Sequence, residues 1–261
     1  MNARTWNLVA PAVLLILVAG CDPKTRAADH ESGERRGPAT ADPTNLVVIF
    51  DPTILEAADG ERFEKILDDL ETYLDAAFDH GGSLVVFEVD GDVLHAPPLF
   101  ERDLQRKETF DRDSQLKKQV LQVSAELRQE LLGSWERAHA DPERQRLNSC
   151  LLTALHRADQ YRQANSSGSA EMLVFSDLLE ACDDGGKMVN FELRLPQHEA
   201  WAKEEAPNLG NYDQVTVIQL PNRHWGTRDQ NSKLRKLWEE MLGRSGTADF
   251  RLLLDVPKRR G

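Results

Sequence analysis

The stretch "NLVVIFDPT", residues 45–53, decides the fold because a continuous apolar run ends abruptly on polar residues. Residues 46–50 are all apolar and do not alternate with polar ones, which is typical of a strand buried on both faces of a parallel sheet. Helices must then cover both faces of that sheet. Asp51, Pro52 and Thr53 follow at the carboxyl end of the strand, which is the edge where open α/β sheets bind ligands.

The rest of the chain alternates between helix and strand patterns. Apolar residues three to four positions apart predict helices over residues 62–78, 113–135, 149–163 and 229–246. Short apolar runs predict further strands over residues 83–89, 171–177, 214–220 and 250–256. Asp90-Gly91 between two apolar runs predicts a hairpin. The fold class is therefore α/β, a three-layer sandwich with a mostly parallel central sheet, one antiparallel hairpin strand and helices on both faces.

The first twenty residues resemble an export signal. An apolar stretch from about residue 8 to 19 follows Arg4, and its length fits a secretory signal better than a spanning helix. Residues 17–21, "LVAGC", resemble a bacterial lipobox, which implies that the Cys21 sulfur carries a diacylglycerol and that the mature chain, with acyl chains such as palmitate, starts there. An ordinary signal with an incidental cysteine is the alternative. We therefore expect a lipid-anchored protein of the cell membrane. Asp22 resembles the retention signal of some Gram-negative lipoproteins, which favours the periplasmic face of the inner membrane if the cell is Gram-negative.

Composition predicts how the chain is organised. The signal peptide spans residues 1–20, and residues 21–43 are too polar to fold, which predicts a disordered tether. Residues 44–257 are long enough for one core and show no repeat, so we expect a single, monomeric domain before a basic tail at residues 258–261. A net charge of −12 argues against a nucleic-acid partner.

Three separated places in the sequence resemble the von Willebrand factor type A (vWA) family. In that family the first strand ends in D-x-S-x-S, and here Asp51 and Thr53 match its first two ligands while Leu55 replaces the second serine. Ser149 stands where the family has a threonine, a few residues before an Ala-Leu pair. Asp177 ends the fourth strand, as the family pattern requires. A vWA-like or Rossmann-like arrangement of strands is therefore expected.

The resemblance implies a divalent-metal site built from Asp51, Thr53, Ser149 and Asp177. These side chains offer the oxygen ligands that Mg²⁺ or Mn²⁺ prefers, and an open position on the ion would receive a carboxylate of a partner. Because Leu55 removes one ligand, we expect metal binding to be weak or absent. The alternative is that the same acids and hydroxyls only cap helices and turns at strand ends.

The resemblance also suggests how the two remaining cysteines are used. Cys150 and Cys182 should both lie at the ligand edge of the sheet, in an oxidising compartment, so a disulfide between them is expected. Two buried thiols are the alternative.

We therefore expect a membrane-anchored envelope lipoprotein that is not an enzyme and whose vWA-like domain binds or scaffolds an unknown protein partner. One alternative is an α/β hydrolase such as a haloacid dehalogenase-like phosphatase, because "FDPT" resembles the start of that family. Thr53 stands in the place of that family's second acid, however, and cannot protonate a leaving group. Another alternative is an accessory protein of a mobile element or a stress system in which only the anchor matters.

Overall fold

The computed structural model describes residues 43–52, 60–89, 96–106, 109, 113–140, 150–165, 168–180, 204, 206–220, 228–247 and 249–253. The chain divides into two units, residues 1–40 and 41–261, and all the described residues belong to the second. The predicted signal peptide, Cys21, most of the tether and the basic tail lie outside the described residues. Among the helices that are described, none is long and apolar enough to cross a membrane.

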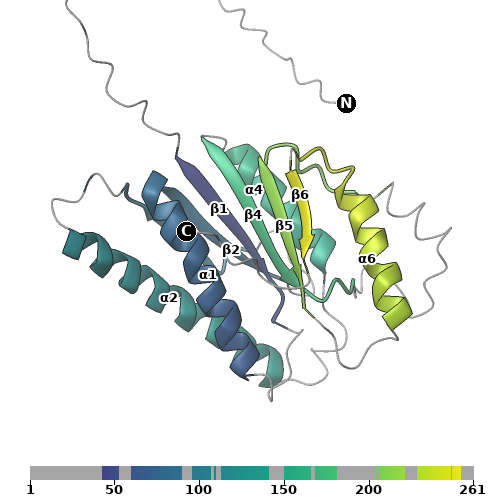
Figure 1. The fold of residues 1–261 in the computed structure, drawn as a ribbon, viewed down its shortest axis with the longest axis horizontal. Coiled ribbons are helices and arrows are strands. Elements are labelled where there is room, and N and C mark those ends of the chain that lie inside the picture. Colours follow the sequence, from purple (N-terminus) through teal and green to yellow (C-terminus); the bar gives the residue numbers. More distant parts are fainter. Residues whose placement is uncertain are drawn as a thin grey trace, which may run out of the picture. The chain divides into compact units, whose positions relative to one another are not determined.

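The centre of the fold is the strand that the sequence singled out. β1 (Thr44–Phe50) lies between β2 (Gly82–Glu88) and β4 (Ser169–Ser176) and pairs with both in parallel (Figure 1). Its side chains alternate between two cores. Leu46, Val48 and Phe50 belong to one cluster of buried side chains and Val47 and Ile49 to the other, and all five are at most 2% exposed. Burial on both faces explains why the run shows no polar alternation.

Within the described residues, three further strands bring the sheet to six, in the order β3-β2-β1-β4-β5-β6. β5 (Gln214–Gln219) and β6 (Asp249–Leu253) continue the sheet in parallel from β4. β3 (Phe100–Leu104) pairs with β2 in the antiparallel direction. The predicted α/β sheet, mostly parallel with one antiparallel strand, is therefore confirmed.

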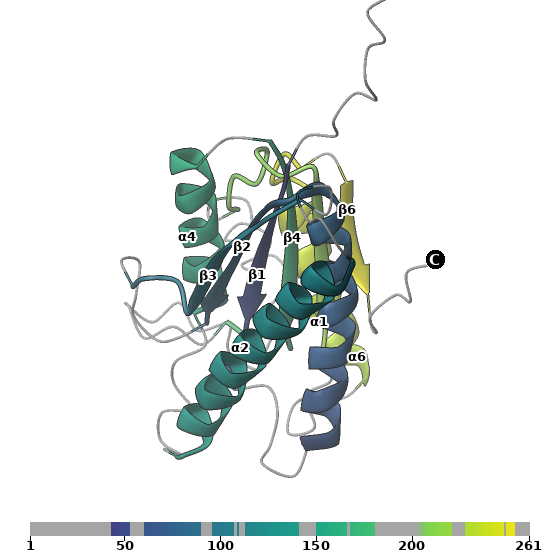
Figure 2. The same ribbon diagram turned by 90° about the vertical axis from the view of Figure 1, so that its left-hand side faces the viewer.

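Helices cover both faces of this sheet, as predicted. α1 (Gly60–His80) and α2 (Asp113–Ala140) contribute buried side chains to the cluster that contains Phe50. α4 (Leu151–Ala164) and α6 (Arg228–Leu242) contribute to the cluster on the other face. Figure 2 shows α4 on one side of the sheet and both α1 and α2 on the other.

The antiparallel strand begins later in the chain than the hairpin pattern indicated. Val86 of β2 lies opposite Phe100, and the Leu99 amide donates to the Val86 carbonyl at 2.8 Å. Pro97 and Pro98, which precede this pairing, have no amide hydrogen to give to a ladder, so the strand starts after them. The residues directly after the predicted Asp90-Gly91 turn lie outside the described part of the chain.

Candidate functional site

The carboxyl ends of β1 and β4 meet at the point where the order of the strands reverses. Such a point is where open α/β sheets form a ligand crevice, because successive connections leave in opposite directions. Phe50 lies opposite Phe175, and the Asp51 amide donates to the Phe175 carbonyl at 3.0 Å. Asp51 therefore lies beside the end of β4, which Asp177 follows directly. Two of the four predicted metal ligands are thus at the same edge of the sheet.

The Asp51 side chain is fully buried, with none of its surface exposed. The Ser176 hydroxyl donates to its Oδ2 atom at 3.1 Å. The same hydroxyl oxygen accepts a hydrogen bond from the Leu178 amide at 3.0 Å. A carboxylate removed from water needs donors or a cation around it, because desolvation of its charge is costly. Ser176 supplies one such donor.

Two more carboxylates lie in the segment that follows β4. Asp177, which is 6% exposed, accepts the Leu179 amide at 2.9 Å. Glu180, which is 5% exposed, accepts the Leu152 amide at 2.9 Å in the first turn of α4. A carboxylate at a helix N-terminus satisfies an otherwise unpaired amide and interacts favourably with the helix dipole. We call Asp51, Asp177 and Glu180 the acidic edge.

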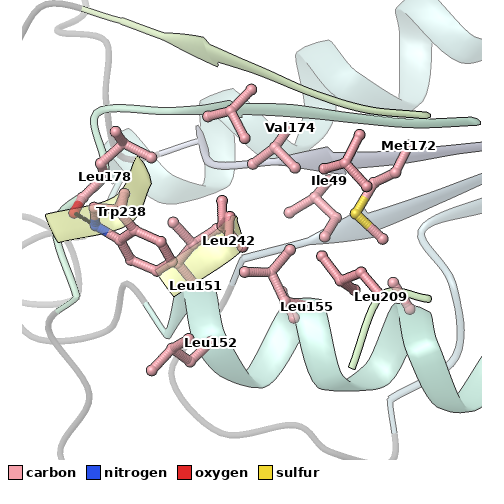
Figure 3. Close-up of a cluster of buried hydrophobic side chains, with 14 of the residues drawn as sticks. Ile49, Leu151, Leu152, Leu155, Met172, Val174, Leu178, Leu209, Trp238 and Leu242 are labelled. Atoms are coloured by element: carbon pink, nitrogen blue, oxygen red, sulfur yellow. Dashed lines mark hydrogen bonds between the residues drawn. The ribbon is translucent and has the colours of Figure 1, made fainter. Parts of the chain in front are cut away.

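Leu178 links the acidic edge to α6. Its backbone has a φ of 68°, in the left-handed region, which costs a residue with a bulky side chain about 1–2 kcal/mol. The Leu178 carbonyl accepts the indole N–H of Trp238 at 2.7 Å, and both residues are completely buried. Figure 3 shows the Trp238 nitrogen facing this carbonyl oxygen among apolar side chains of α4 and the sheet. Surrounding contacts thus fix a backbone conformation that is unfavourable on its own.

Thr53 and Ser149, the two predicted hydroxyl ligands, lie outside the described residues, as does Cys182. Cys150 is 1% exposed at the N-terminus of α4, and its sulfur is disulfide-bonded. Its bonding partner is not among the described residues, so the pairing with Cys182 stays a prediction.

The groups at this edge have the chemistry of a site for a hard cation. Asp51 and Asp177 offer carboxylate oxygens, and Mg²⁺ and Mn²⁺ prefer oxygen ligands. In the parts of the chain that the structure describes, no group of three or more His, Cys, Asp or Glu side chains is arranged to hold a metal ion. Two carboxylates are fewer than the six ligands of an octahedral ion, so an ion bound by Asp51 and Asp177 would need further oxygen ligands from hydroxyl groups or water.

The sequence did not reveal three residues that organise this edge. Ser176 precedes the predicted Asp177 directly, and strand alternation could have placed it on the same face as Val174. No local sequence pattern points to Glu180 or Trp238. Their hydrogen-bond partners, Leu152 and Leu178, lie 28 and 60 residues away in the chain.

The comparisons with known proteins show no family for this chain. No family model matches the sequence, and no curated protein matches it. Among solved structures, the pilus adhesin SpaC from Lactobacillus rhamnosus GG, in an open conformation, is similar with a TM-score of 0.43 and 11% sequence identity. The similarity covers 81% of this chain and 28% of the adhesin chain. At this level it is a weak likeness in fold.

Proposed function

We propose that this protein is an envelope lipoprotein, anchored through acyl chains on Cys21, whose α/β domain is vWA-like and binds or scaffolds a protein partner. The lipobox-like "LVAGC" and the polar segment after it support the anchor and the tether. The order of the strands, the antiparallel β3 and the acids that follow β1 and β4 agree with the vWA resemblance. In this proposal the protein acts by binding and not by catalysis.

One observation carries the proposal, namely the juxtaposition of Asp51 and the Ser176-Asp177 pair at the reversal of strand order. Asp51 and Asp177 would hold a Mg²⁺ or Mn²⁺ ion, with Thr53 and Ser149 as further oxygen ligands. The ion would supply an electrophilic position for an acidic side chain of the partner. Because Leu55 stands in the place of one family ligand, we propose that the ion binds weakly and that the partner completes its shell.

Cross-linking in native envelopes tests this proposal. Membranes that contain the full chain are treated with a lysine-reactive cross-linker, with the wild type beside an Asp51→Asn, Asp177→Asn double variant. Asp249→Asn is the matched control, because Asp249 begins β6 at the opposite edge and pairs with Arg251 on the surface.

We expect one adduct of defined mass in the wild type and in Asp249→Asn. The adduct should be lost in the double variant and on chelation of divalent ions, while circular dichroism shows that the variant is folded. An adduct that is equally abundant in the folded double variant would contradict a partner site at the acidic edge.

A further inference from the structure

Ser176 occupies a central position at the acidic edge. It is fully buried, and its hydroxyl is used both as a donor, to Asp51 Oδ2 at 3.1 Å, and as an acceptor, from the Leu178 amide at 3.0 Å. One side chain therefore connects the acid that follows β1 with the segment that follows β4. A hydroxyl can make both bonds at once because it has one hydrogen and two lone pairs.

The bond from the Leu178 amide to Ser176 lies in the segment that also contains Asp177. The Leu178 amide is held by Ser176, and the Leu179 amide is held by Asp177 Oδ1 at 2.9 Å. These two consecutive amides fix the turn that carries Asp177 and that contains the left-handed Leu178. The same hydroxyl group therefore contacts Asp51 directly and also contacts the backbone of the turn that carries Asp177.

We infer that Ser176 is a positioning residue that sets the geometry of both predicted metal-ligand carboxylates, through its bonds to Asp51 and to the Leu178 amide. The inference rests on the proposed function of this edge. Groups that hydrogen-bond to metal ligands fix the orientation of those ligands before the ion arrives, and their loss typically weakens metal binding 10- to 100-fold.

Isothermal titration of the full chain with Mn²⁺ tests this role. Ser176→Ala removes the hydroxyl, Ser176→Thr retains it, and Ser83→Ala is a matched control because Ser83 donates to Asn45 at 2.8 Å on the opposite edge of the sheet. We expect Ser176→Ala to raise the dissociation constant at least about tenfold, with Ser83→Ala unchanged and Ser176→Thr within about threefold of the wild type. Equal affinities of Ser176→Ala and the wild type would overturn the inference.

A second measurement separates this inference from the proposed metal site. If the wild type binds no Mn²⁺, the metal site itself is wrong, and so is the role of Ser176 toward a metal. Urea unfolding of Ser176→Ala, Asp51→Asn and the combined variant then tests whether the two side chains are coupled at all. Shifts of the unfolding midpoint that do not add would show that Ser176 orients Asp51 in a metal-free edge, whereas additive shifts would overturn the positioning role entirely.

Discussion

Replacing Trp238 with phenylalanine removes one hydrogen bond at the acidic edge while it retains an aromatic ring. Trp238 is completely buried on α6, and its indole N–H donates to the Leu178 carbonyl at 2.7 Å. Phenylalanine has no donor, so the variant leaves this buried carbonyl without its indole partner. The left-handed turn at Leu178 then loses one of the contacts that hold it.

The expected cost follows from burial and geometry. A buried acceptor that loses its donor costs about 1–3 kcal/mol, and the smaller ring leaves a space that costs about 1 kcal/mol more. Together these two costs lower the free energy of unfolding by about 3 kcal/mol. If this free energy falls by about 3 kcal/mol for each molar of urea, the unfolding midpoint drops by about 1 M.

Trp135 provides the matched control for this substitution. It stacks on Phe63 with a centroid distance of 5.1 Å, and within the described residues its buried Nε1 atom has no hydrogen-bond partner. Trp135→Phe therefore loses no hydrogen bond, and we expect it to cost less than about 1 kcal/mol. Urea unfolding followed by far-UV circular dichroism measures both variants. Equal midpoints for Trp238→Phe and Trp135→Phe would refute the importance of the bond from Trp238 to Leu178.

Three further predictions concern the core, the pH dependence and the anchor. Ser134 is fully buried on α2, and within the described part of the chain its hydroxyl has no partner; we expect Ser134→Ala to stabilise the protein by about 1–2 kcal/mol in urea unfolding, and a lower midpoint would contradict this. Burial, followed by the charge of Asp159, raises the pKa of Tyr212, whose hydroxyl donates to the Ala158 carbonyl. Because the raised pKa belongs to the folded state, this contribution to stability is present below the unfolded pKa of about 10 and is lost as the pH rises above it. Tyr212→Phe should therefore lose less stability than the wild type between about pH 9 and pH 11, and parallel pH curves would argue against this. Finally, Cys21→Ser should move the protein from the detergent phase to the aqueous phase in detergent partitioning, whereas retention in detergent would contradict lipid attachment.

Much of the fold could be predicted because local patterns of apolar residues indicate its strands and helices. The non-alternating run of residues 46–50 predicted a central strand, and β1 is paired on both sides. The helical spacing around Leu127 and Leu131 predicted α2, in which both side chains are buried. The antiparallel strand was harder to place. The Asp90-Gly91 pattern indicates a turn but not where the next strand begins, and β3 begins only after Pro97 and Pro98, which cannot donate a backbone hydrogen bond.

The candidate site was predictable only in part. Strand-end position and family resemblance indicated Asp51 and Asp177, and the structure brings both to one edge. The contacts that fix this edge are long-range, such as the bond from Ser176 to Asp51 across 125 residues of sequence. Periodicity and local motifs do not record such contacts, because they arise only when the sheet has formed.

A calorimetric titration of the full chain with Mg²⁺ and Mn²⁺, beside the Asp51→Asn, Asp177→Asn double variant, tests the proposed metal site most directly. The proposed site predicts weak but saturable binding that the double variant loses and the Asp249→Asn control keeps. If the wild type shows no saturable heat, or if the double variant binds equally well, the acids at the ends of β1 and β4 do not form a metal site.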